Sequence, residues 1–289
     1  MNLEPVAAAQ TTLLIDRLAH FRHAWVVLML LSACAVGGAC PAADSPAKLR
    51  PTVKVKLFVP AYFYPAGEGL KEWDRLIAAA AVPIVAIANP ASGPGERADP
   101  NHAKIIGRAA RAGVTVIGYV STQYAKKPRA RVKAEIDRWK EFYPSIKGVF
   151  FDEQTSDASQ VDYYRELFDY SRKKIKDGFV ASNPGVACDV AYVTEACADL
   201  VCVFEHFEAY DDFTPPPAWG EKARRRAAVV PYQTTDADQM RQRLHRAAQF
   251  HLGYFYATDA GGANPWDRLP TYFDDEVAAV REVNRPRKK

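Results

Sequence analysis

The chain has 289 residues, of which 48% are hydrophobic and 25% are charged, and its formal net charge is +4. This is an ordinary globular composition, and the weak, scattered positive charge argues against a nucleic-acid partner, which usually requires a concentrated basic stripe. Without an N-terminal segment of about fifty residues, roughly 240 residues remain, the usual size of one (β/α)8 barrel.

Residues 1–34 are predicted to be an export segment. Basic residues at positions 17 and 22 stand ahead of a short apolar run over residues 24–31. A positive flank followed by a short apolar stretch is typical of a secretory signal, and the run is too short to cross a bilayer as a stable helix. The protein is therefore expected to be exported.

The end of this segment, Leu-Ser-Ala-Cys at residues 31–34, looks like the lipobox of bacterial lipoproteins. That likeness implies lipidation of Cys34 and anchoring to the outer face of a bacterial membrane. The alternative is a plain signal cleaved after Ala33 or Ala35, which would give a secreted protein. Residues 35–52 are rich in Ala, Gly, Pro and Ser, and are predicted to form a flexible tether.

Export implies an oxidising environment, in which cysteines can pair. We predict a disulfide between Cys188 and Cys197, because both fall outside the predicted strands, whereas Cys202 lies inside one as a buried thiol. The chain has no CxxC pair, and its six histidines lack ligand spacing. The sequence therefore predicts no metal site, and we expect no cofactor.

From residue 53 to residue 284, short apolar runs alternate with amphipathic stretches. The predicted strands are 55–60, 84–89, 114–120, 148–152, 179–183, 200–205, 227–232 and 253–257. The predicted helices are 70–80, 100–112, 129–142, 159–176, 190–197, a short one within 217–226, 236–250 and 271–283. This alternation predicts a parallel sheet. Eight such units favour a closed barrel, so the predicted fold class is α/β, a single (β/α)8 barrel of the TIM type, followed by a solvated basic tail over residues 285–289.

Two of the predicted strands deliver acids to the same rim of this barrel. The strand 148–152 ends at Asp152 and Glu153, and the strand 200–205 ends at Glu205. In parallel α/β folds this carboxyl-terminal rim binds ligands. Paired carboxylates are what cleavage of a glycosidic bond needs, because one protonates the leaving oxygen while the other attacks or activates water. If the strand continues, Asp152 and Glu153 point to opposite sides, so one of them faces the barrel axis.

The other strand ends carry hydroxyls, amides and aromatic rings. The substrate-binding residues predicted from these positions are Tyr62, Tyr64, Asn89, Tyr119, Asn183, His206, Tyr232, Tyr256, Asp259 and Trp266. Several have a structural alternative: the two asparagines stand in turn sequences, His206 can be a structural hydrogen bonder, and Trp266 can be either packing or a sugar platform. The rim lacks a cluster of Lys or Arg, so a strongly anionic substrate is poorly explained.

Six sequence blocks follow one another over 59–65, 87–95, 117–120, 148–153, 183–185 and 203–205. Together, and in this order, they resemble the spherulin-4 family. The resemblance implies a secreted (β/α)8 glycoside hydrolase that cuts galactosamine-containing exopolysaccharide at N-acetylgalactosamine linkages. It also implies that the catalytic acids are the Asp-Glu pair after the fourth strand and the Glu after the sixth, which are Asp152, Glu153 and Glu205 here.

We therefore expect an exported monomer whose partner is a polysaccharide substrate and which acts as an endo-acting, retaining α-N-acetylgalactosaminidase-like enzyme. The first assignment is Glu205 as nucleophile and Asp152 or Glu153 as acid/base, with the exchanged roles left open. One alternative is a non-catalytic polysaccharide-binding surface or spore-coat protein. Another is deacetylation, which commonly uses a metal.

Overall fold

The computed structural model describes residues 53–286. The predicted export segment with Cys34 and the predicted tether lie outside the described residues, as do the last three residues of the predicted basic tail. Within residues 53–286, no helix is both long enough and apolar enough to cross a membrane.

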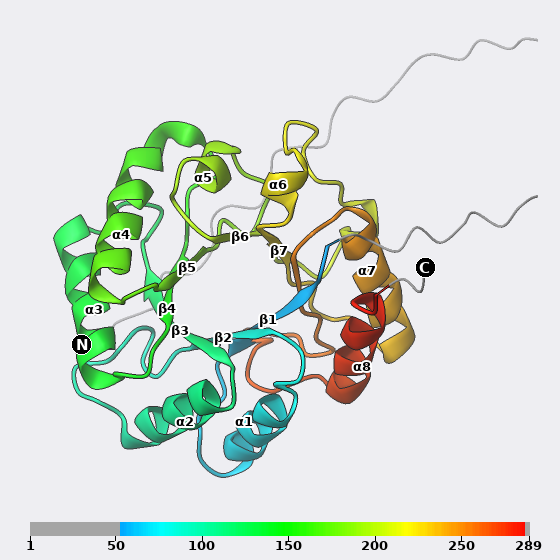
Figure 1. Cartoon of the computed structure of the whole chain (residues 1–289), viewed down its shortest axis with the longest axis horizontal. Helices are drawn as coiled ribbons and strands as arrows, with labels where there is room; N and C mark the ends of the chain where they lie inside the picture. The colour runs from blue at the N-terminus through cyan, green and yellow to red at the C-terminus, as the bar shows by residue number, and fades with distance from the viewer. Residues whose placement is uncertain (1–52, 287–289) are drawn as a thin grey trace, which may run out of the picture. The chain divides into compact units, whose positions relative to one another are not determined.

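Eight strands form a closed barrel in which each strand pairs in parallel with its neighbours in sequence and β8 pairs with β1 (Figure 1). The strands are β1 (Lys56–Ala61), β2 (Ile84–Ala88), β3 (Thr115–Ser121), β4 (Gly148–Asp152), β5 (Phe179–Ser182), β6 (Leu200–Phe204), β7 (Ala227–Val229) and β8 (Tyr254–Phe255). The predicted (β/α)8 barrel is therefore confirmed.

A ring of helices surrounds the barrel (Figure 1). They are α1 (Glu68–Ala78), α2 (Pro100–Arg111), α3 (Arg129–Phe142), α4 (Val161–Lys174), α5 (Ala191–Thr194), α6 (Glu221–Arg224), α7 (Ala237–Gln249) and α8 (Phe273–Val283), with short 3-10 turns η1 (Ala158–Gln160) and η2 (Tyr210–Asp212). α5 and α6 are single turns of four residues each. Asp99 and Asp236 cap α2 and α7 by accepting backbone N–H bonds.

Both faces of the strands are buried, which explains their continuous apolar runs. Every residue of β2 and β6 is buried, because one face fills the barrel and the other packs against helices. Gly118 in β3 shows how closely a helix approaches: a Cβ there would lie 2.3 Å from the ring of Trp139 on α3. The Trp139 indole also donates a hydrogen bond of 2.9 Å to the carbonyl oxygen of Tyr119.

The two ends of the barrel domain are joined by the side chain of Asn284, just after α8. Its Oδ1 accepts a hydrogen bond from the backbone N–H of Val55, and its Nδ2 donates to the carbonyl oxygen of Val55, both at 2.8 Å. Val55 lies just before β1, so this pair of hydrogen bonds ties the C-terminal helix to the amino-terminal end of the barrel.

The predicted disulfide between Cys188 and Cys197 is wrong, because both thiols are free and buried, as is that of Cys202. Cys197 Sγ donates to the carbonyl oxygen of Val161 at 3.5 Å, whereas the carbonyl of Cys188 accepts a bond of 3.2 Å from the indole of Trp219. The two residues are thus held by different elements. Burial raises the pKa of Cys188 to about 12 and that of Cys197 to about 11, so both stay protonated near neutral pH.

Candidate active site

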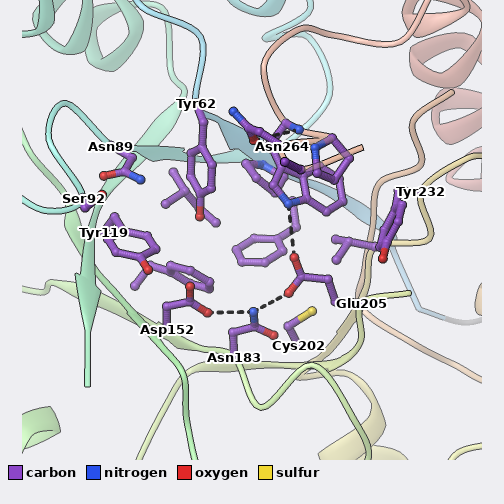
Figure 2. Close-up of a pocket in the computed structure, with 18 of the residues that line it drawn as sticks. Tyr62, Asn89, Ser92, Tyr119, Asp152, Asn183, Cys202, Glu205, Tyr232 and Asn264 are labelled. Atoms are coloured by element: carbon purple, nitrogen blue, oxygen red, sulfur yellow. Dashed lines mark hydrogen bonds between the residues drawn. The ribbon is translucent and has the colours of Figure 1, made fainter. Parts of the chain in front are cut away.

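A pocket of about 670 Å³ opens at the carboxyl-terminal end of the strands (Figure 2). It is lined by side chains from the ends of seven strands and from the loop after β8. The lining residues are Phe58, Pro60, Tyr62, Ile87, Asn89, Pro90, Ala91, Ser92, Tyr119, Phe150, Asp152, Asn183, Cys202, Glu205, Val230, Tyr232, Gly262, Ala263, Asn264, Pro265 and Trp266.

Regular strand alternation brings Asp152 into this pocket. Phe150 and Asp152 are alternate residues of β4, so both point into the barrel. Phe150 packs against Phe58 of β1 with ring centroids 5.9 Å apart, and these rings contribute to the pocket floor. Asp152 stands one layer higher, at the end of the strand.

A β-bulge brings Glu205 into the same pocket. Cys202 pairs with Ala228 of β7, and Phe204 pairs with the next residue, Val229, so β6 has one extra residue at this point. Regular alternation from Cys202 would turn Glu205 away from the barrel axis, but the extra residue reverses the phase, and both Cys202 and Glu205 line the pocket. Phe204 packs instead on Tyr210, with ring centroids 5.1 Å apart.

One side-chain nitrogen bridges the two acids. Asn183 follows β5, and its Nδ2 lies 2.9 Å from Asp152 Oδ1 and 2.5 Å from Glu205 Oε2 (Figure 2). Because both oxygens bond to the same nitrogen, the distance between them is at most the sum of the two hydrogen-bond lengths, 5.4 Å. The other oxygen of Glu205 accepts a hydrogen bond of 3.2 Å from the indole of Trp266.

Burial raises the pKa of both carboxyl groups, but their surroundings differ. Hydrogen bonds from Tyr119, Asn183 and the backbone N–H of residue 153 oppose the rise in the pKa of Asp152, and the negative charge of Glu153 adds to that rise. The pKa of Glu205 is raised by burial and further by the negative charge of Asp152, against bonds from Asn183 and Trp266. Asp152 thus accepts hydrogen bonds from three donors and Glu205 from two, and this difference in donors favours Asp152 as the anion and Glu205 as the protonated acid.

The third predicted acid, Glu153, does not line the pocket. Its backbone has a left-handed conformation, with φ of 57°, and its carboxylate accepts a hydrogen bond from the hydroxyl of Ser121. Its carbonyl oxygen accepts bonds from the backbone N–H of Tyr124 at 2.7 Å and from the hydroxyl of Thr122 at 2.9 Å. Glu153 thus joins the loop after β4 to the loop after β3.

Six of the predicted substrate-binding residues line the pocket: Tyr62, Asn89, Tyr119, Asn183, Tyr232 and Trp266. Four do not. The Tyr64 hydroxyl bonds to Asp99 at 2.9 Å on the exposed side of the loop after β1. Asp259 bonds to Arg268 and to the hydroxyl of Thr271, both at 2.7 Å, and so fixes the loop after β8.

The remaining two are Tyr256, which lies behind the pocket wall, and His206, which lies outside the pocket at its rim. Tyr256 is fully buried, with its ring centroid 6.2 Å from that of Trp266, so it supports that indole from behind. His206 is exposed at the rim and stacks on the ring of Phe207 at 4.6 Å.

The structure adds pocket residues that the sequence did not indicate, among them Ser92 and Asn264. Ser92 belongs to a loop held by the Asn89 side chain, which accepts the backbone N–H of Gly93 at 3.0 Å. Asn264 accepts the backbone N–H of Trp266 at 3.2 Å. An Asn directly before a Pro is a sequence signal for such a turn, and it could have identified Asn264.

The pocket lining contains two carboxyl groups and no Lys, Arg or His. Within the described residues, no group of three or more His, Cys, Asp or Glu side chains is arranged to hold a metal ion. The arrangement suits acid and nucleophilic chemistry on a neutral or cationic ligand with hydroxyl groups.

The family model for spherulation-specific family 4 matches residues 56–280. The chain is 30% identical over 244 residues to Spherulin-4 of Physarum polycephalum, covering 80% of this chain and 71% of that protein.

Two solved structures are similar. The crystal structure of Aspergillus clavatus Sph3 in complex with GalNAc matches with a TM-score of 0.66 and 26% identity, covering 79% of this chain and 98% of that one. The spore cortex-lytic enzyme SleL of Bacillus cereus matches with a TM-score of 0.52 and 9% identity, covering 82% of this chain and 76% of that one, a likeness of fold alone. The domain is a glycoside-hydrolase-like barrel. The chain belongs to spherulation-specific family 4.

Proposed function

We propose that this protein is a retaining glycoside hydrolase that cleaves an amino-sugar polysaccharide. The observation that carries the proposal is the pair of partly buried carboxyl groups, Asp152 and Glu205, held by one amide of Asn183 with their bonded oxygens within 5.4 Å. The carboxyl groups of retaining enzymes lie about 5 to 5.5 Å apart, whereas inverting enzymes leave about 6.5 to 9.5 Å for a water molecule. The bridged pair supports the retaining geometry.

The surroundings of the two acids favour the exchanged roles, with Asp152 as nucleophile and Glu205 as acid/base. Asp152 is bonded by three donors and is thereby favoured as an anion, which is the state that attacks. The charge of Asp152 raises the pKa of Glu205, so Glu205 keeps the proton that the leaving oxygen needs.

The reaction then has two steps. In the first, Asp152 attacks the anomeric carbon, the glycosidic C–O bond breaks, and the proton of Glu205 passes to the leaving oxygen, which gives a glycosyl ester on Asp152. In the second, the Glu205 carboxylate takes a proton from water, whose oxygen attacks the anomeric carbon and breaks the ester. Both groups return to their starting states, and the sugar keeps its anomeric configuration.

The choice of an amino sugar rests on similarity and on the pocket lining. Sph3, which is 26% identical, has been crystallised in complex with GalNAc. The pocket here offers the tyrosines Tyr62, Tyr119 and Tyr232 and the indole of Trp266, which suit the faces and hydroxyls of a sugar ring. The absence of a basic residue from the lining disfavours a uronic acid.

Release of reducing ends from an N-acetylgalactosamine polymer, fully or partly acetylated, tests the proposal. The wild-type protein should release reducing ends, and the activity of the Asp152→Asn and Glu205→Gln variants should be more than about 1,000-fold lower. Glu195→Gln, on a surface carboxylate bonded to Arg165, is the matched control and should keep it. A wild-type protein that binds the polymer but releases nothing would instead identify a binding protein.

A further inference from the structure

A second aromatic cluster lies beside the pocket, on the side of Glu205. The loop after β6 carries His206 and Phe207, whose rings stack with centroids 4.6 Å apart and planes inclined by 19°. Phe207 also lies 5.6 Å from Tyr232, and Tyr232 lies 5.9 Å from Trp266, so aromatic rings continue from inside the pocket to its outer rim. Figure 2 shows Tyr232 on the side of Glu205 that is remote from Asp152.

The loop that carries this cluster is anchored at both ends. At its start, the backbone N–H of Glu205 bonds to the carbonyl oxygen of Gly185 at 2.9 Å, and the carbonyl of His206 accepts the N–H of Tyr232 at 3.2 Å. At its end, the buried Tyr210 donates to the carbonyl oxygen of Arg243 at 3.1 Å. A binding surface held in this way loses little conformational entropy when a ligand arrives.

The cluster is accessible although it is apolar. Phe207 is 37% exposed, and in residues 53–286 the exposed large hydrophobic side chains are Tyr64, Tyr124, Val186 and Phe207. Each of the four lies in a loop that follows a strand, and so on the face that bears the pocket. A single exposed apolar side chain is ordinary on a protein surface, so the contacts of each one decide its meaning. Phe207 is the one that aromatic contacts join to the pocket.

His206 adds a directed polar group to this surface. Its Nδ1 accepts the backbone N–H of Glu208 at 3.0 Å, so in the neutral ring the proton is on Nε2. An N–H beside an exposed ring is suited to the hydroxyl or acetamido oxygen of a sugar whose apolar face rests on the ring.

We propose that His206 and Phe207 form a platform for the sugar unit on the leaving-group side of the cleaved bond. The inference rests on the proposed function: Glu205 protonates the leaving oxygen, so the leaving sugar lies on the side of Glu205, where the chain continues directly into His206 and Phe207. A platform there lets the enzyme hold a polymer across the bond it cuts.

The test compares two substrates that differ in their leaving group. An amino-sugar polymer requires the leaving-group side of the site, whereas a glycosyl fluoride of the same sugar has a single-atom leaving group and does not. Phe207→Ala should lower kcat/KM for the polymer roughly tenfold, and Phe207→Leu by less, because loss of one aromatic contact has an effect of this order. Both variants should hydrolyse the fluoride at the wild-type rate.

His206→Ala should behave like Phe207→Ala. Tyr170→Ala, which removes a ring from α4 on the outer wall, is the control and should leave both substrates unaffected. Equal losses on polymer and fluoride, or no loss on the polymer, would overturn the platform while leaving the proposed function intact. A wild-type protein that is inactive on both substrates would overturn the proposed function and the platform with it.

Discussion

The indole nitrogen of Trp266 donates a hydrogen bond of 3.2 Å to the carboxylate of Glu205, across 61 residues of sequence. Trp266→Phe would keep an aromatic ring and remove this donor. Because the bond favours the ionised carboxylate, its loss should raise the pKa of Glu205. An acid with a higher pKa stays protonated to higher pH, so the alkaline limb of the pH–rate profile should move upward, with kcat roughly tenfold lower.

The control is Trp219→Phe, which removes an indole that bonds to the carbonyl of Cys188 outside the pocket. Its pH profile should match the wild type. An unchanged alkaline limb in Trp266→Phe would contradict the role of Glu205 as the acid.

Asn183 acts on both acids, so its removal should shift both limbs. Its bonds lower the pKa of Asp152 and of Glu205. Asn183→Ala should therefore raise both pKa values. The acid limb, where Asp152 must be ionised, and the alkaline limb, where Glu205 must be protonated, should both move to higher pH. The variant should also have a kcat/KM about 10- to 100-fold lower.

Asn183 also accepts the backbone N–H of Gly185 at 2.8 Å through its Oδ1. Asn183→Asp keeps that acceptor but replaces the bridging donor with a carboxylate oxygen. It should move both limbs at least as far as Asn183→Ala does. A wild-type profile in Asn183→Asp would show that Asn183 only shapes the turn.

The assignment of nucleophile and acid can be separated by chemical rescue. Asp152→Gly should be inactive alone, and azide should restore cleavage of a substrate with a good leaving group, giving a glycosyl azide of inverted anomeric configuration, because azide attacks from the vacated side. Glu205→Gly with azide should give the retained configuration, because Asp152 still forms the ester. If NMR showed the retained azide from Asp152→Gly and the inverted azide from Glu205→Gly, Glu205 would be the nucleophile and Asp152 the acid/base.

Gly118 in β3 should be sensitive to the smallest substitution. A Cβ at this position would lie 2.3 Å from the Trp139 ring, which is itself fully buried. Gly118→Ala should reduce the free energy of unfolding by about 1 to 3 kcal/mol or more, measured by denaturant titration. Gly220→Ala is the control, because no atom lies within 4 Å of the added carbon and φ is −61°. Gly220 is the N-cap of α6, where Gly is preferred to Ala, so this change should cost no more than about 1 kcal/mol.

Glu276 should make stability depend on pH. It is completely buried in α8, and its Oε1 accepts the backbone N–H of Ala257 at 2.7 Å. Burial raises its pKa well above 4.5, so the folded state keeps a proton that the unfolded chain releases. Stability is therefore lost as pH rises above about 4.5.

Glu276→Gln keeps the acceptor and removes this titration. As the pH rises from about 4.5 to 8, the melting temperature of the variant should increase steadily relative to that of the wild type. Glu282→Gln, on the exposed face of the same helix, should show no such trend. A constant difference between Glu276→Gln and wild type would show that Glu276 titrates alike in both states.

The strands could be predicted because each is a short apolar run with its own boundaries. β4 begins and ends at the predicted residues, while β7 and β8 are shorter than predicted. β7 stops at Val229, just before Val230 and Pro231, and a proline has no N–H with which to extend the pairing. The ends of the predicted strands placed Asp152, Glu153 and Glu205 at the rim, and alternation predicted that only one of Asp152 and Glu153 faces the barrel axis, without deciding which. The inward direction of Glu205 depends on the bulge in β6, which depends on pairing with β7 and is not encoded locally.

The incorrect disulfide and the residues outside the pocket share one cause. Position along the sequence identifies the rim but not the direction of a side chain within a loop. Tyr64 and Asp259 follow strands as Tyr62 and Trp266 do, yet they bond to neighbours in their own loops. Cys188 lies in a long loop, where contacts with distant side chains decide its environment.

The double hydrogen bond between Asn284 and Val55 brings the beginning and the end of the barrel domain together, at the end of the strands opposite to the pocket. A support, a label or a second domain could be attached at either end without approaching the pocket. Because the ends meet, the domain also has the arrangement suited to insertion into another protein or to circular permutation. An immobilised form joined through either end would present its pocket to polymer in solution.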